Sequence, residues 1–88
     1  MKLIAFLILS LFVTPVLAWS GQDADLGTAV MISDRDKAKP GNEIIYYDYN
    51  KEEYRTAEVT SVFGFNKTVQ VQVYDIDTGK NRVFDMEK

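Results

Sequence analysis

The chain has 88 residues, with ten Lys and Arg side chains against thirteen Asp and Glu side chains, and it contains neither Cys nor His. Without thiols and imidazoles it has no disulfide framework, no Cys or His nucleophile, and none of the nitrogen and sulfur ligands on which zinc and copper sites depend. An acidic chain without basic clusters suits neither nucleic acid nor an anionic membrane, so we expect neither as a partner.

The first 18 residues have the organisation of a secretory signal peptide. Lys2 supplies a positive start, residues 3–13 form an apolar run broken once, and Pro15 interrupts any helix before the small residue Ala18 at a cleavage site. The apolar run is too short for a membrane span, which needs about 20 residues to cross roughly 30 Å. The sequence therefore predicts a signal peptide at residues 1–18 and a periplasmic or secreted mature chain that does not insert into the membrane.

The next segment, residues 19–26, has neither the period of a strand nor that of a helix, so we expect a flexible N-terminal arm. Trp19 is the only aromatic side chain of this segment. It either folds back onto the domain or binds a partner, and the sequence leaves both open. We therefore include Trp19 among the candidate binding residues.

Residues 27–88 alternate apolar and polar side chains in short runs separated by turn residues, as antiparallel strands do. Val71 and Val73 show the clearest alternation, and Val59 and Phe63 of the preceding run are expected on the inward face. With no helical pattern, this is an all-β domain, either a small five-stranded SH3-like barrel or a curled antiparallel meander that buries one face against a partner. The strands are expected at residues 28–33, 43–49, 54–63, 68–75 and 81–86.

A strand–turn–strand motif occurs twice, 27 residues apart, and Asp48 and Arg55 of the first copy correspond to Asp75 and Arg82 of the second. The repeat reflects either a duplicated hairpin or convergence on good hairpin chemistry. A four-residue loop at residues 77–80 places Asp75 opposite Arg82, and the same register places Asp48 opposite Arg55. Opposite charges paired across strands contribute about 0.2–1 kcal/mol. We interpret these four residues as structural ion pairs.

No set of side chains has the spacing of a catalytic or metal site. Asp75 and Asp77 begin like a calcium loop, but Thr78 and Asp85 stand where a further ligand and the closing Glu are needed. The serines have no His base, and so small a chain leaves little room for a cleft between two carboxylates. We therefore expect no enzyme activity, no catalytic residue, no metal site and no cofactor.

Tyrosines mark the surface with the best binding chemistry. Tyr47, Tyr49 and Tyr74 are expected on the outward face of their strands. There a tyrosine offers contact area at low entropic cost together with a hydroxyl group. The alternative is that the rings only cover the outside of the domain. An exposed edge strand that adds a strand from a partner is a further way to bind.

Three stretches carry a resemblance to a known group of proteins. They are the Ala-Trp-Ser-Gly start at residues 18–21, Tyr-Asp-Tyr at residues 47–49, and the second hairpin at residues 71–86. In order and spacing the chain resembles a family of short exported bacterial proteins of unknown function, with a signal peptide, an Ala-Trp mature start and two Tyr-Asp hairpins. The resemblance implies export to a Gram-negative periplasm, and it implies no activity and no ligand.

These features together predict a small non-enzymatic binding module that acts on a protein or peptide in the cell envelope. Its candidate binding residues are Tyr47, Tyr49, Tyr74 and Trp19. The alternative, suggested by the acidic turns, is a protein that binds calcium or an envelope polysaccharide. Neither the identity of the partner nor the oligomeric state follows from the sequence.

Overall fold

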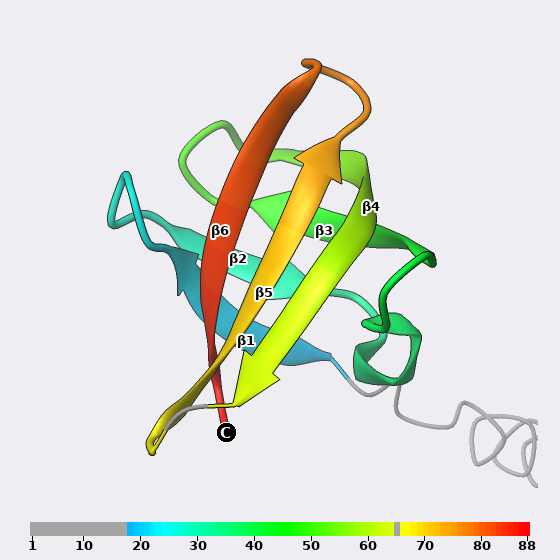
Figure 1. The fold of residues 1–88 in the computed structure, drawn as a ribbon. Helices are drawn as coiled ribbons and strands as arrows, with labels where there is room; N and C mark the ends of the chain where they lie inside the picture. The colour runs from blue at the N-terminus through cyan, green and yellow to red at the C-terminus, as the bar shows by residue number, and fades with distance from the viewer. Residues whose placement is uncertain (1–17, 65) are drawn as a thin grey trace, which may run out of the picture.

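The computed structural model describes residues 18–64 and 66–88, which form a closed antiparallel barrel (Figure 1). The all-β prediction is confirmed, but the predicted count of five strands is wrong because the barrel has six. Except for Ala18, the predicted signal peptide lies outside the described residues. The strands are β1 (Trp19–Asp23), β2 (Ala29–Ile32), β3 (Glu43–Asp48), β4 (Glu53–Gly64), β5 (Thr68–Asp75) and β6 (Lys80–Glu87).

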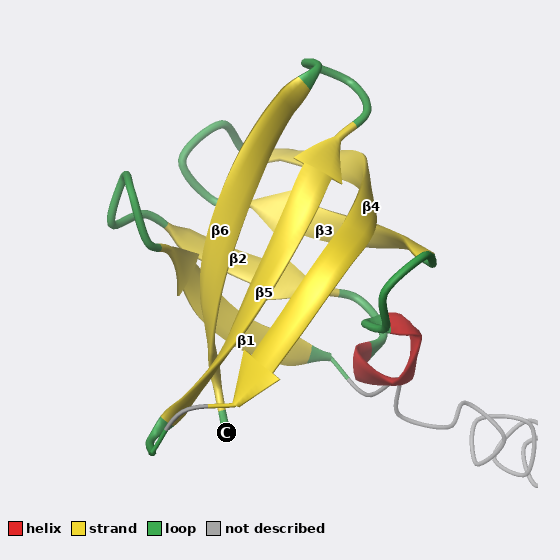
Figure 2. Cartoon of the chain, in the orientation of Figure 1, coloured by secondary structure: helices red, strands yellow, loops and turns green. Residues whose placement is uncertain are grey.

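Strands and short turns make up nearly all of the described chain (Figure 2). The 3-10 turn η1 (Arg35–Lys37) lies in the connection between β2 and β3, and the side chain of Asp34 caps it by accepting a hydrogen bond from the backbone of Asp36 at 3.0 Å. Because neighbouring strands are antiparallel, this connection lies at the opposite end of the barrel from the β1–β2, β3–β4 and β5–β6 turns.

Strand β1 closes the barrel because it pairs with both β2 and β6. Gly21 lies opposite Val30 on one side and Met86 on the other. A Cβ atom at Gly21 would stand 2.5 Å from the carbonyl oxygen of Asp85, so β6 approaches this closely only because the residue is glycine. Closure leaves no unpaired sheet edge among the six described strands, which rules out the addition of a partner's strand to an exposed edge.

Residues 19–26, which the sequence indicates as a flexible arm, form β1 and its turn. The inward positions of this strand are Trp19, Gly21 and Asp23, so it lacks the apolar alternation by which the other strands are recognised. Trp19 is buried, and its Nε1 donates a hydrogen bond to the carbonyl oxygen of Glu87. The tryptophan is therefore part of the core.

The core is made of inward side chains from all six strands, together with Ala38 of the β2–β3 connection. Tyr46 and Phe84 are its largest fully buried side chains, and their rings meet edge to face with centroids 4.9 Å apart. The other buried apolar residues are Trp19, Val30, Ile32, Ala38, Ile44, Ala57, Val59, Val71, Val73 and Met86.

Strand β4 contains a bulge between Val59 and Ser61. The extra residue reverses the inward and outward alternation beyond it, so Val62 packs against the core and Phe63 is half exposed. The expected inward position of Phe63 is therefore wrong.

The predicted register of both hairpins is wrong by two residues. Asp75 lies opposite Lys80 rather than Arg82, and the first hairpin is shifted in the same way, with Arg55 opposite Tyr46. A shift of two keeps every side chain on its predicted face because the period of a strand is two. It nevertheless moves each arginine one inward position deeper into the barrel than the aspartate of its own hairpin.

Candidate functional site

The three hairpin turns at one end of the barrel share one geometry. Strands β1, β3 and β5 end in Asp23, Asp48 and Asp75, and a loop of four or five residues follows each. One oxygen of each carboxylate accepts hydrogen bonds from the backbone N–H groups two and three residues further on, at 2.9 to 3.2 Å. The aspartate itself thus closes the turn, which explains the shifted register. The fourth residue of each loop has a positive φ, and these residues are Gly27, Glu52 and Gly79.

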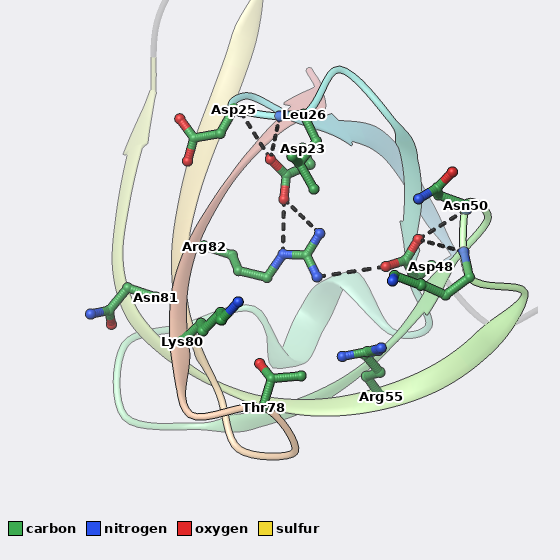
Figure 3. Close-up of a pocket in the computed structure, with 11 residues that line it drawn as sticks. Asp23, Asp25, Leu26, Asp48, Asn50, Arg55, Thr78, Lys80, Asn81 and Arg82 are labelled. Atoms are coloured by element: carbon green, nitrogen blue, oxygen red, sulfur yellow. Dashed lines mark hydrogen bonds and ion pairs between the residues drawn. The ribbon is translucent and has the colours of Figure 1, made fainter.

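The three turns surround a cavity of about 360 Å³, which we call the barrel mouth (Figure 3). Charged side chains of both signs line it, and most of those labelled in Figure 3 point toward its centre, whereas Asp25 points away from it. The cationic ones are Arg55, Arg82, Lys51 and Lys80. The anionic ones are Asp23, Asp25 and Asp48.

Arg82 lies at the centre of the barrel mouth and joins the three hairpins (Figure 3). Its Nε donates to Oδ2 of Asp23 at 2.8 Å, and its Nη2 makes an ion-pair contact of 2.7 Å with the same oxygen. Its Nη1 lies 3.5 Å from Asp48 and 3.8 Å from Asp75. Burial alone lowers the pKa of Arg82, but the hydrogen bond to Asp23 and the surrounding carboxylates outweigh burial and raise it. The guanidinium is therefore a permanent charge.

Tyr46 holds the innermost carboxylate of the mouth. Its hydroxyl donates to Oδ2 of Asp75 at 2.6 Å and accepts from Nη1 of Arg82 at 3.3 Å. Burial alone raises the pKa of Asp75, but the hydrogen bonds from Tyr46 and the turn amides, with the charge of Arg55, outweigh burial and lower it. Burial and the hydrogen bond to Asp75 raise the pKa of Tyr46. The pair therefore consists of an anionic carboxylate and a neutral phenol.

Arg55 is held less completely than Arg82. Its Nη2 donates to Oε1 of Glu53 at 2.7 Å, and its Nη1 lies 3.5 Å from Oδ2 of Asp75. Its Nε is buried and has no hydrogen-bond partner in the described part of the chain. Buried polar groups normally have a partner, so Arg55 carries an unused donor beside the barrel mouth.

The four residues of the predicted ion pairs come together in one cluster, in which, among the described residues, the predicted contact between Asp75 and Arg82 is present at 3.8 Å and the predicted contact between Asp48 and Arg55 is not. Arg55 contacts Asp75 of the other hairpin, and Arg82 contacts Asp48 as well as Asp75. Within residues 18–64 and 66–88, no ion pair joins Asp48 to Arg55. Two of these contacts cross between hairpins, because each arginine lies deeper than the aspartate of its own hairpin.

Two members of this cluster, Asp23 and Tyr46, were missed by reasoning from the sequence. A signal for Asp23 was present, because it precedes Gly27 by the same four residues that separate Asp75 from Gly79. No sequence pattern indicated a role for Tyr46, since a tyrosine on the inward face of a strand is normally interpreted as a core residue. We refer below to Asp23, Asp48, Asp75, Arg55, Arg82 and Tyr46 as the mouth cluster.

The mouth cluster keeps charges in fixed positions. Each of its carboxylates has one oxygen bound by a turn and the other facing a guanidinium or a hydroxyl group. Asp77, part of the calcium-like pattern, instead accepts a hydrogen bond from the backbone of Thr56 at 3.0 Å. In the residues that the structure describes, no group of His, Cys, Asp and Glu side chains is arranged to hold a metal ion.

A second candidate site lies on the outer face of β3 and β4. The rings of Tyr47 and Tyr49 meet edge to face with centroids 4.8 Å apart, and those of Tyr47 and Tyr54 meet at 4.9 Å. We call these three residues the tyrosine cluster. Met31 lies opposite Tyr47 in β2 and extends the surface across a third strand. Tyr54 is absent from the predicted set, although its position opposite Tyr47 follows from the observed register.

The other predicted binding residues lie elsewhere. Tyr74 is exposed on β5, where its neighbours in register are Glu58 and Asn81, outside the tyrosine cluster. Trp19 is buried in the core, with the guanidinium of Arg35 4.3 Å from its ring centroid. The structure therefore brings Tyr47 and Tyr49 together and separates both from Trp19.

The fold and these sites define a small closed antiparallel β-barrel with a charged mouth and an aromatic outer surface. Residues 19–88 match DUF5334, a family of unknown function, and the chain belongs to this family. No curated protein and no solved structure matches the chain. Among the described residues, no helix is both long enough and apolar enough to cross a membrane.

Proposed function

We propose that this protein is a small non-enzymatic binding module that acts on a protein or peptide in the cell envelope through its tyrosine cluster. The observation that carries the proposal is the exposure of the rings. Tyr49 is 51% exposed and Tyr54 is 64% exposed, although they belong to one continuous group of three aromatic side chains. Contiguous exposed apolar surface on a small protein is a feature of interaction sites.

The tyrosine cluster is suited to binding because its rings are already ordered. Edge-to-face contacts hold Tyr47 against both neighbours, so a partner orders few additional torsions when it binds. Ile45, which is also half exposed, precedes Tyr47 by two residues on the same outward face of β3. The closed barrel beneath supplies a rigid base, and the hydroxyl groups supply directed hydrogen bonds at the edge of the surface.

Export to the periplasm or beyond is part of the proposal. The first 18 residues have the composition of a signal peptide. Both the first strand and the family match begin at Trp19, the residue that follows the predicted cleavage site. A family match that starts at this residue is compatible with removal of residues 1–18.

A non-enzymatic role is supported by the state of the titratable groups. The chain has no thiol and no imidazole, and the buried carboxylates of the mouth cluster are engaged by turn amides and guanidinium groups. Such groups have no free position from which to take a proton from a substrate.

The test uses in-cell crosslinking of a tagged copy, followed by recovery from the envelope fraction and mass spectrometry. The double variant Tyr49→Ala with Tyr54→Ala is expected to lose a partner that the wild type captures. The single variant Tyr74→Ala, which removes an exposed tyrosine outside the cluster, is expected to retain it. Capture that survives the double variant, with the fold intact by circular dichroism, would show that this surface is not the site.

An envelope polysaccharide is the second candidate ligand, since exposed aromatic rings also stack on sugars. The same variants distinguish it from a protein partner. Retention of the wild type on isolated envelope glycan, with no protein partner captured and with loss of retention in the double variant, would favour the polysaccharide. The calcium form of the alternative has no support from the described residues, because none of their carboxylate groups is arranged as a metal site.

A further inference from the structure

We propose that the barrel mouth is a binding site for a carboxylate group, held by Arg55 in the place that Glu53 now occupies. The site is distinct from the tyrosine cluster in position and chemistry, so it goes beyond the binding function proposed above. Four observations support it, which are the volume of the cavity, the unused donor of Arg55, the exposed position of Glu53, and the free cations at the rim.

The cavity has room for such a ligand. Its volume is about 360 Å³, and three rigid turns surround it. A water molecule occupies roughly 30 Å³ in the liquid, so a group of several heavy atoms fits in addition to its carboxylate. Arg55 and Lys80 point into this space together with Arg82 (Figure 3).

The guanidinium of Arg55 has an incompletely used edge. Nε and Nη2 lie on the same edge of a guanidinium, and a carboxylate normally accepts from both in parallel. At Arg55, Glu53 takes only Nη2, while Nε is buried and without a partner among the described residues. The edge is therefore half occupied, and a carboxylate with better geometry completes it.

Glu53 is a replaceable occupant. Its side chain is 50% exposed, and it lies two residues before Arg55 on the same face of β4. An ion pair with so exposed a partner contributes little to stability. A ligand carboxylate that displaces Glu53 keeps one negative charge beside the guanidinium of Arg55. The side chain of Glu53 then rotates out into the solvent.

The remaining charges select for an anion at this position. Arg82 is already paired with Asp23, which accepts a hydrogen bond from its Nε at 2.8 Å and lies 2.7 Å from its Nη2, although this Nη2 makes no hydrogen bond among the described residues. Lys51 and Lys80 line the mouth, and neither has an ion-pair partner in the described part of the chain. These two ammonium groups lie on the same lining as Arg55, and they attract an approaching anion toward it.

The test is a titration of the purified protein with N-acetylalanine, monitored by amide and arginine Hε chemical shifts at constant ionic strength. N-acetylalaninamide, which has the same shape without the charge, is the matched probe. We expect saturable shifts at Arg55 Hε and at the turn amides of Asn50 and Thr78 with the acid only. Equal shifts with both probes, or no shift at Arg55, would overturn the proposal.

Three variants sharpen the test. Arg55→Gln is expected to weaken N-acetylalanine binding at least about tenfold, the usual loss for a hydrogen bond to a charged group. Arg35→Gln removes the same charge at the opposite end of the barrel and should leave binding unchanged. Glu53→Gln removes the tethered competitor and should strengthen binding by up to about fivefold. If Arg55→Gln fails to fold, Glu53→Gln decides, since binding that does not strengthen contradicts a carboxylate at that place.

A free organic acid and the C-terminus of a peptide offer the same chemistry, and a further titration separates them. A short peptide that binds more tightly than N-acetylalanine, and loses this advantage when its C-terminus is amidated, identifies a chain end as the source. Equal affinity of the acid and the peptide identifies a small acid. Binding of the amidated peptide with the same shifts at Arg55 would overturn the carboxylate site without affecting the proposed tyrosine surface.

Discussion

The two ends of the barrel are closed by different chemistry. At one end the ring of Trp19 packs into the core, its Nε1 bonds a backbone carbonyl, and the exposed cation of Arg35 lies over it. At the other end three buried carboxylates converge on Arg82. The first end is stabilised mainly by removal of apolar surface from water, and the second by the mutual compensation of charges that are costly to bury alone. We therefore expect the stability of the second end to depend more strongly on charge and pH than that of the first.

The largest expected effect comes from removing the central cation of the mouth. Arg82→Met leaves three buried carboxylates facing a thioether and should destabilise the fold by about 3–5 kcal/mol, or prevent folding. The same substitution at the other end, Arg35→Met, removes only an exposed cation–π contact and should cost about 0.5–1 kcal/mol. Urea denaturation of both variants measures the difference. Equal costs at the two ends would contradict the contrast drawn between them.

A smaller decrease in the free energy of unfolding is expected on acidification, and it should arise from the carboxylates of the barrel mouth. The pKa of Asp75 is lowered from its ordinary value of 3.8, so its contribution to stability is complete above that value and is lost as the pH falls through the lower pKa of the folded state. We therefore expect the free energy of unfolding to fall as the pH drops below about 4. Urea midpoints between neutral and strongly acidic pH measure this.

Asp75→Asn is the matched variant for the acid experiment. It should be less stable at neutral pH by about 1–3 kcal/mol, because an amide cannot satisfy both Tyr46 and the arginines. Its stability should also depend less steeply on acid than that of the wild type. An identical slope in both proteins would place the acid sensitivity elsewhere.

The smallest expected effect comes from the one position at which the three turns of the mouth differ in residue type. Glu52 has a φ of 56° at the place where the other two turns have glycine. Because a side chain is strained in this conformation, Glu52→Gly should stabilise the fold by about 1 kcal/mol. Glu58→Gly, the same change within β4, should destabilise it by roughly 0.5–1 kcal/mol. Thermal denaturation measures the melting temperatures of the two variants. If both melting temperatures shift in the same direction, the three turns do not share one backbone geometry.

Much of the fold was predictable because it rests on local patterns. The inward positions of Val71 and Val73, and the outward positions of Tyr47 and Tyr49, follow from a period of two, which the backbone of any strand imposes. The four residues Asp48, Arg55, Asp75 and Arg82 attracted attention as a repeat, and they do lie in one cluster. The contact between Asp75 and Arg82 was predicted, but the contacts between the two hairpins were not, since a shift of two residues preserves every face and changes which residues lie opposite each other.

The remaining differences arise where a local pattern is absent or interrupted. Strand β1 has Trp19, Gly21 and Asp23 at its inward positions. Gly21 allows the close approach of β6, and Asp23 pairs with Arg82, so neither position is occupied by an apolar side chain. The bulge after Val59 reverses the expected face of Phe63. A strand whose inward side chains contact distant elements lacks the alternation of apolar residues by which strands are recognised, even where the spacing of its turn residues offers a local signal.

The amino-acid sequence by itself determined the class of fold, the turns between the later strands and the face to which most side chains belong, because these follow from backbone geometry and from the alternation of apolar residues. Only the tertiary structure decided that a sixth strand closes the barrel, that three aspartates share two arginines, and that Tyr54 joins Tyr47 and Tyr49 on the surface. Those outcomes depend on register and closure, which are set by contacts between residues far apart in the chain.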